Sequence, residues 1–350
     1  MKVKLLPLAI GAAIAMPGVA MAAPTVYGKM NVAYGMADVD NGADSADKWE
    51  LESYDSRVGV KGDEKISDSL TAFYQAEFKI NVDDGGGSGT FDQRDIFVGF
   101  KGGFGAIKVG KFDTPFKKAQ GKIDLFGDTT GDIKYVFSNE ERVSNILQYS
   151  TPEMSGLQAN LAIIPGEEFD DGTNDDPKDG PADAFSASLT YNMDNLYLAL
   201  AHDSEVASEA YAAIDAGYDL VDTDTVPLDA TRLVGVFKMD MFQFGAMYQM
   251  AETSDADQDG DAELNGYLLS GSMKLSDEVK LKAQWGASTI EDNDADEEAD
   301  IELLAVGADY ILSKQTNLYA HYTTWSSEFD FAGAEEQTYD KIDFGVIHKF

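Results

Sequence analysis

A two-residue alternation of apolar and polar side chains is the feature that most constrains how this chain can fold. In residues 341–350, the apolar Ile342 and Phe344 alternate with the charged Lys341 and Asp343. Successive side chains of an extended strand point to opposite faces, so the pattern predicts strands with one apolar and one polar face. Two further segments alternate in the same way, residues 70–81 and 279–285.

Tight turns and long connections follow each other along the chain and divide it into sixteen predicted strands. An even number of strands joined alternately by short and long connections is typical of a bacterial outer-membrane barrel, with short periplasmic turns and long external loops. The predicted strands are residues 25–35, 50–62, 69–81, 91–102, 104–112, 142–151, 156–165, 184–193, 195–204, 230–239, 241–252, 263–274, 278–289, 300–311, 315–326 and 339–350.

A closed antiparallel barrel follows from the physics of the bilayer. After residue 22 the chain has no run of 18 apolar residues, which excludes a membrane-spanning helix. A sheet can lie in hydrocarbon only when it closes and leaves no unpaired edge. A soluble all-β fold is the alternative, but it would not need every second loop to be long. Aromatic residues recur near predicted strand ends, as in a membrane-interface girdle: Tyr34, Phe185, Tyr191, Phe237, Phe242, Tyr248, Trp285, Tyr310, Tyr322 and Phe350.

The first 22 residues are predicted to be a secretory signal peptide. Lys2 and Lys4 supply a positive start, residues 5–15 form a short apolar run, and small residues end at Ala22, where we expect cleavage. A buried N-terminal helix is the alternative. The predicted barrel domain then comprises residues 23–350.

Composition narrows the functional classes. The chain has 26 Lys and Arg against 63 Asp and Glu, a formal charge of −37, which opposes binding to nucleic acid. It has no cysteine, so disulfides and thiolate metal sites are excluded. Its three histidines are far apart and show no catalytic spacing, so we expect no enzymatic activity and no cofactor. A barrel enzyme using His202 or His321 and a structural or adhesive barrel remain alternatives.

Four predicted external loops hold most of the acidic residues. Together they carry 28 acidic residues and one lysine, Lys178. Such a mouth attracts cations over a Debye length of roughly 8–10 Å, which predicts weak cation selectivity. The loops are residues 165–183, 204–229, 252–263 and 289–300. The third contains closely spaced hard oxygen ligands, as a weak Ca²⁺ or Mg²⁺ site would: Asp255, Asp257, Asp259 and Asp261.

Several segments resemble the Gram-negative general diffusion porins. The similarity extends over essentially the whole predicted mature chain, and the order and spacing of the motifs carry it. The motifs are Val26-Tyr-Gly-Lys29, Ser56-Arg-Val-Gly-Val-Lys-Gly-Asp-Glu64, Phe104-Gly-Ala-Ile-Lys-Val-Gly-Lys111, Arg142-Val-Ser-Asn-Ile-Leu-Gln-Tyr-Ser-Thr-Pro152 with Ser155-Gly156, and the terminal Phe350.

The resemblance implies a homotrimer of sixteen-stranded barrels in the outer membrane, surrounded by lipid and lipopolysaccharide. It also implies that Phe350 is the signal read by the barrel-assembly machinery. A third loop, residues 113–141, would fold into the lumen and form a constriction. Its acidic side would be Asp124 and Asp128, and the basic side on the barrel wall would be Lys29, Arg57, Arg94 and Arg142.

The function predicted from these features is passive diffusion of small hydrophilic solutes and ions through a water-filled channel. Opposed charges across a narrow waist would orient polar solutes and disfavour apolar ones. The alternative is a porin specific for a sugar or an organic ion, which an aromatic slide in the lumen would support. The candidate residues for such a slide are Tyr197, Tyr267 and Tyr319.

Overall fold

The computed structural model describes residues 23–83, 91–167, 178–209, 212–214, 220–222, 225–254, 261–294, 297–330 and 335–350. The predicted signal peptide, residues 1–22, lies outside this part of the chain and stays a prediction. In the described part, no helix has the length and apolar character needed to cross a membrane.

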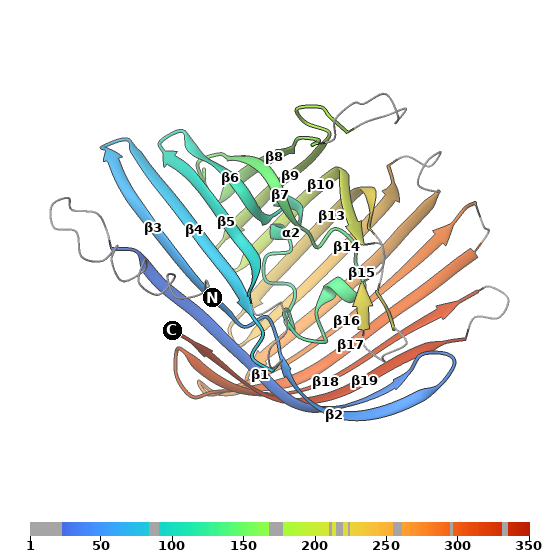
Figure 1. The fold of residues 1–350 in the computed structure, drawn as a ribbon. Coiled ribbons are helices and arrows are strands. Elements are labelled where there is room, and N and C mark those ends of the chain that lie inside the picture. The colour runs from blue at the N-terminus through green and yellow to red at the C-terminus, as the bar shows by residue number, and fades with distance from the viewer. Residues whose placement is uncertain are drawn as a thin grey trace, which may run out of the picture.

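Long antiparallel strands form the whole wall (Figure 1). Their bounds are β1 Thr25–Asp40, β2 Ser45–Ser53, β3 Arg57–Ser67, β4 Leu70–Ile80, β5 Phe91–Gly102, β6 Gly105–Asp113, β7 Arg142–Ser150, β8 Leu157–Ile164, β9 Ala184–Met193, β10 Leu196–Glu209, β13 Thr225–Met239, β14 Phe242–Thr253, β15 Ala262–Lys274, β16 Val279–Asp292, β17 Glu297–Ile311, β18 Thr316–Phe329 and β19 Gln337–Lys349. A separate small hairpin consists of β11 Ala212–Ile214 and β12 Leu220–Asp222.

The sheet closes on itself because its first and last strands pair. β1 and β19 run antiparallel over twelve residue pairs, from Lys29 to Asp40 of β1. Beyond this ladder, Gly28 and Phe350 exchange both backbone hydrogen bonds, at 3.0 and 3.1 Å. The first and last strands of the barrel, β1 and β19, therefore lie side by side (Figure 1). The predicted sixteen-stranded barrel is confirmed, with β2 and β3 counting as one position in the ring.

The position shared by β2 and β3 differs from the prediction. Residues 50–62 were expected to form one strand, but the ladder is interrupted between Ser53 and Arg57. Asp55 has a φ of +48°, a left-handed conformation that departs from the extended backbone of a regular strand. Asn31 of β1 holds the interruption, since its N–H donates to Ser56 Oγ and its carbonyl accepts from Tyr54 N–H.

Other strands extend further toward the long-loop end than the sequence predicted. β1 and β2 continue to a four-residue turn at 41–44, where a longer connection was expected. β10 and β13 extend into the predicted loop 204–229, past a register shift between Asp203 and Val206. Val206 and Leu228 are buried on the inner face. The apolar–polar alternation of a strand therefore continues into this segment, although its many acidic residues made it look like a loop in the sequence.

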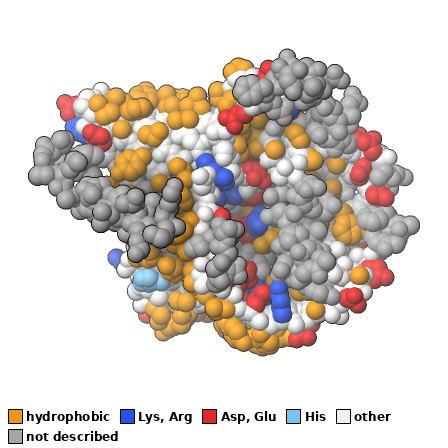
Figure 2. Space-filling view, viewed as in Figure 1, with side chains coloured by type: hydrophobic (Ala, Val, Ile, Leu, Met, Phe, Trp, Pro, Cys, Tyr) orange, Lys and Arg blue, Asp and Glu red, His pale blue; other side chains and the backbone are white. Residues whose placement is uncertain are grey.

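The two faces of the wall have opposite character. Large apolar side chains cover its outside, whereas lysine, arginine and acidic side chains gather in the central hollow (Figure 2). The predicted girdle aromatics that are strongly exposed include Tyr34, Tyr248 and Tyr310. Tyr34 also stacks on Trp49 of β2, with ring centroids 5.2 Å apart. This distribution suits hydrocarbon outside and water inside.

The third loop, residues 114–141 between β6 and β7, crosses the interior with the short helices α2 (Pro115–Lys118) and η1 (Ile133–Tyr135) (Figure 1). It packs on inward-facing apolar residues of β13–β18, which explains why part of the inner wall is not polar. Burial of each large side chain contributes about 1.5–3 kcal/mol. The buried cluster includes Phe116, Ile123, Ile133, Val136 and Phe137 of the loop, and Leu264, Leu268, Ile301 and Leu303 of the wall.

We expect Gly28→Ala to destabilise the closure of the barrel. A Cβ atom at this position would lie 2.4 Å from the ring of Phe350 and 2.7 Å from the carbonyl oxygen of Arg57. Forced contacts of this kind cost about 1–3 kcal/mol. Thermal unfolding of the purified variant in detergent should therefore occur at a lower temperature.

Gly271→Ala is the matched control for this substitution, because the heavy atom nearest to the added Cβ would be 3.8 Å away. Equal unfolding temperatures for Gly28→Ala and Gly271→Ala would contradict the expectation.

Candidate functional site

A charged cavity of about 910 Å³ lies between the third loop and the inner wall formed by β3–β7. Eleven acidic and eight basic side chains line it, a formal excess of three negative charges. The opposite side of the loop is packed on apolar residues of the wall. The barrel lumen is thus open on its charged side and filled on its apolar side.

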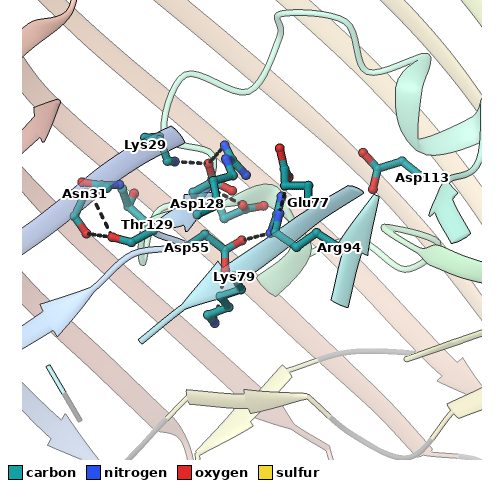
Figure 3. A network of polar contacts seen from close by, with 12 residues as sticks. Lys29, Asn31, Asp55, Glu77, Lys79, Arg94, Asp113, Asp128 and Thr129 are labelled. Carbon is teal, nitrogen blue, oxygen red and sulfur yellow. Dashed lines mark hydrogen bonds and ion pairs between the residues drawn. The ribbon is translucent and has the colours of Figure 1, made fainter. Parts of the chain in front are cut away.

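Asp128 connects the loop to the basic wall. Its carboxylate binds the ammonium group of Lys29 (Figure 3). The same carboxylate lies 2.9 Å from Nη2 of Arg57. Lys29 and Arg57 are paired across neighbouring strands, which explains why both reach one carboxylate. The Asp128 N–H donates to Asp132 Oδ2 at 2.7 Å, and this bond fixes the turn that presents the carboxylate.

Arg94 binds two acidic residues of the wall. Its Nη1 lies 2.6 Å from Asp55 Oδ2, and its Nε donates to Glu77 Oε1 at 2.8 Å (Figure 3). Lys79 adds a second cation at 3.1 Å from Asp55. The left-handed backbone at Asp55 places this carboxylate inside the barrel, so the interruption between β2 and β3 helps to build the site.

Arg142 occupies the junction between the loop and the wall. Its Nε donates to Asp95 Oδ1 and its Nη2 reaches Asp113 Oδ1, both at 2.7 Å. Asp113 and Arg142 also face each other in the register of β6 and β7, at the two ends of the loop. Asp113 binds Lys118 of α2 as well.

Asp124 has a different environment from Asp128. Its Oδ1 accepts from the N–H of Phe126 at 2.9 Å, and the contacts in the described residues include no ion pair with the four basic wall residues. Burial and the neighbouring carboxyl of Asp132 raise the pKa of Asp124 well above its usual range. Asp124 and Asp128, which the sequence predicted on the same side of the constriction, therefore differ in their contacts.

The sequence predicted the four basic residues but missed the wall acids that bind them. Asp55, Glu77 and Asp95 neutralise much of the charge of Arg94 and Arg142. Glu77 was detectable, because it lies on the polar face of an alternating segment. Asp55 was not, because its inward position depends on the interruption of the strand.

The proposed aromatic slide does not form. Tyr267 is 51 % exposed on the outer face and contacts the ring of Trp285, so its placement in the lumen was wrong. The outward position follows from the register of β15, in which Leu264 and Leu268 point inward. Tyr319 is buried against Asn31, to which its hydroxyl donates at 2.9 Å. Tyr197 does lie inside the barrel, beside the loop.

Polar side chains of the opposite wall hold the backbone of the loop. Gln284 accepts from Leu125 N–H at 2.8 Å and donates to the carbonyl of Gly131 at 2.6 Å. The fully buried Arg232 lies 2.6 Å from Glu140 Oε1. Such bonds satisfy backbone groups that the irregular loop would otherwise bury unpaired. Further anchors come from Ser186, Gln249, Lys282, Ser288 and Trp325.

The predicted divalent-cation site is only partly within the described residues. Asp255, Asp257 and Asp259 lie outside them, while Asp261 is included and its N–H donates to Asp294 at 3.2 Å. Within the described part of the chain, no three histidine, cysteine or acidic residues are grouped as metal ligands. This site stays a prediction.

Comparisons with known proteins agree with the barrel fold. A family profile described as Gram-negative porin matches residues 9–328. The chain belongs to the Gram-negative porin family. This porin is 25 % identical over 341 residues to the major outer membrane protein P.IB of Neisseria gonorrhoeae, covering 91 % of each chain. It is 26 % identical to an outer membrane porin protein of Bordetella pertussis, covering the whole of both.

Solved structures show the same fold. The anion-selective porin from Comamonas acidovorans has a TM-score of 0.74 at 22 % identity, covering 94 % of this porin and 99 % of that chain. The trimer form of OmpT from Vibrio cholerae has a TM-score of 0.67 at 18 % identity, covering 94 % and 100 %. This porin is therefore an outer-membrane protein, and proteins of its family are channels rather than enzymes.

We expect the docking of the third loop to weaken as pH rises from the ordinary aspartate range through the raised pKa of Asp124. The docked loop holds the proton of this carboxyl more tightly than the detached loop does, so deprotonation disfavours docking. Hydrogen exchange of residues 123–137, corrected for its intrinsic pH dependence, should show protection that falls with pH.

Asp124→Asn should reduce this pH dependence, because the amide cannot ionise but keeps an oxygen for the N–H of Phe126. Asp63→Asn is the control, since Asp63 binds Lys101 on the wall and should leave the pH dependence unchanged. Protection that increases with pH in the wild-type porin would be incompatible with this account.

Proposed function

We propose that this porin is a water-filled channel for passive diffusion of small hydrophilic solutes and ions. The observation that carries the proposal is the charged cavity between the wall and a third loop that is fixed to the opposite wall. Diffusion along a concentration gradient needs no catalytic group and no cofactor, and the mechanism includes neither.

The proposed constriction consists of Lys29, Arg57, Arg94 and Arg142 on the wall and Asp128 on the loop. Lys29 and Arg57 face Asp128 directly, so a transverse field acts at this point. Arg94 and Arg142 have wall carboxylates as their nearest partners and contribute less net positive charge. The sequence predicted Asp124 on the acidic side of the constriction as well. Its raised pKa lowers the fraction of this carboxyl that is ionised, so it contributes less negative charge than Asp128.

Weak cation selectivity is the finer part of the proposal. The acidic residues of the cavity exceed the basic ones, and the external loops are strongly acidic in sequence. The similar barrel from Comamonas acidovorans is described as anion-selective, the opposite sign to the one proposed for this porin. Selectivity depends on the charges that each chain places in and around its lumen.

We propose that the porin assembles as a homotrimer, in line with the trimer form of the similar OmpT structure. Its exposed apolar outer surface would be covered by neighbouring subunits, lipid and lipopolysaccharide. Phe350, which completes the backbone bonds of the closing seam, is the proposed signal for the barrel-assembly machinery.

The purified porin should form ion-conducting channels in a planar bilayer and should weakly prefer cations. The measurement is the reversal potential across a potassium chloride gradient, because its sign reports which ion crosses more easily. Absence of conductance would contradict the channel function, whereas conductance with a clear chloride preference would contradict only the proposed selectivity.

Asp128→Asn should shift the reversal potential toward chloride, because Lys29 and Arg57 lose their shared anion. Loss of one lumen charge should change the permeability ratio by about twofold, the effect of a partly screened interaction. Asp124→Asn is the matched control in the same loop, and we expect it to have a smaller effect at neutral pH. An equal or larger effect of Asp124→Asn would refute the different roles given to the two residues.

A further inference from the structure

A second cavity, of about 550 Å³, lies inside the barrel on the other side of helix α2. It shares Lys118 and Gly121 of the loop with the first cavity. Gly156, Asp194 and Asn195 also line it, and they belong to the short turns between β7 and β8 and between β9 and β10. The second cavity is therefore at the short-turn end of the lumen, below the proposed constriction.

The basic residues of this cavity differ from those of the constriction. Four lysines line it: Lys118 binds Asp113, whereas Lys108, Lys122 and Lys238 form no ion pair within the described residues. In the first cavity, the three arginines all bind carboxylates. Unpaired cations are notable in a chain with 63 acidic and 26 basic residues. The second cavity thus offers positive charge that is not already neutralised.

Lys108 is held in a defined position. Its ammonium group lies 3.6 Å from the ring centroid of Phe112 and 5.1 Å from that of Phe97. These two cation–π contacts fix the position of the ammonium group without supplying a counter-anion. Lys122 and Lys238 are exposed, Lys122 on the loop and Lys238 at the end of β13, so their charges can reach a solute from two other sides.

Uncharged polar side chains form a further part of the cavity wall. Their amides and hydroxyls follow the inner faces of β7, β8 and β9 and are joined in a chain of hydrogen bonds. Gln148 Nε2 donates to Asn160 Oδ1 at 3.4 Å, and Asn160 Nδ2 donates to Ser188 Oγ at 3.2 Å. Tyr197 packs beside Gly121 and donates to the carbonyl of Ala119 at 2.9 Å, which holds its ring at the cavity edge.

We propose that this cavity is a binding subsite for a polyhydroxylated solute that carries one oxyanion group, such as a sugar acid or a sugar phosphate. The inference rests on the proposed channel function and names a class of solute for it. The lysines would bind the carboxylate or phosphate, and the amide and hydroxyl wall would exchange hydrogen bonds with the hydroxyls.

The two acidic residues of the cavity favour hydroxyls over a bare anion. Glu153 and Asp194 line it near the short turns. Each carboxylate can accept hydrogen bonds from solute hydroxyls, which offset its repulsion of the solute's anionic group, and an anion without hydroxyls has no such compensation. A neutral sugar has no anionic group with which the lysines could form an ion pair. The combination of both kinds of group points to a solute that is both charged and hydroxylated.

The test is current through single open channels in a planar bilayer, in potassium chloride with added solute. We expect gluconate and glucose 6-phosphate to reduce the current with saturation. Glucose and acetate should need a concentration at least about threefold higher for the same reduction, since each lacks one of the two interactions. Whichever of gluconate and glucose 6-phosphate acts at the lower concentration identifies carboxylate or phosphate as the preferred group.

Two variants test the site itself. Lys122→Gln with Lys238→Gln should weaken block by the two hydroxylated anions by about tenfold, as two screened charge interactions do together. Asn160→Asp adds a negative charge with little change in size and should weaken their block by about threefold while leaving glucose unchanged. Lys314→Gln is the control, because Lys314 is exposed in a short turn at the same end but does not line the cavity.

Block that is equal for all four solutes, absent, or unaffected by the cavity variants would overturn the subsite. Current in potassium chloride without added solute distinguishes failure of the subsite from failure of the channel function. A channel that conducts but shows no selective block refutes the subsite alone, whereas a protein that does not conduct refutes the proposed channel function.

Discussion

The pairing of β1 with β19 is the interaction on which the rest of the structure depends. In hydrocarbon an unpaired backbone group costs several kcal/mol, so a membrane sheet with a free edge would be unstable. The twelve residue pairs of this seam, extended by the two bonds between Gly28 and Phe350, remove that edge. Closure in turn creates an inside, where charged residues can remain in water.

The third loop folds inward because the closed barrel has an interior that it can fill. Sixteen strands enclose a space wider than their own side chains can fill. The loop fills one half by packing Phe116, Ile133 and Phe137 on apolar positions of the wall, and wall side chains bond its irregular backbone. The other half stays open and charged. The same loop thereby separates the lumen into the two cavities, each with its own chemistry.

Charge in this lumen is arranged in two different ways. In the first cavity, arginines are compensated by carboxylates of the wall and by Asp128, which gives a strong local field with a small net charge. In the second, Lys108, Lys122 and Lys238 have no such partners among the described residues. In the proposed channel, a solute would meet the paired charges of the first cavity and then the lysines of the second, so net composition alone does not describe its surroundings.

The sequence by itself determined the closed sixteen-stranded barrel and its alternating faces, because a two-residue period and the spacing of turns are local properties of the chain. The inward third loop was implied by the resemblance to the general diffusion porins. The resemblance also identified Lys29, Arg57 and Asp128, which the structure brings together. Only the tertiary structure decided the interruption at Asp55, the places of Asp55 and Asp95 beside Arg94 and Arg142, the burial of Asp124 and the outward position of Tyr267. These features depend on register between strands and on what the loop covers, and both are set by contacts between residues far apart in sequence.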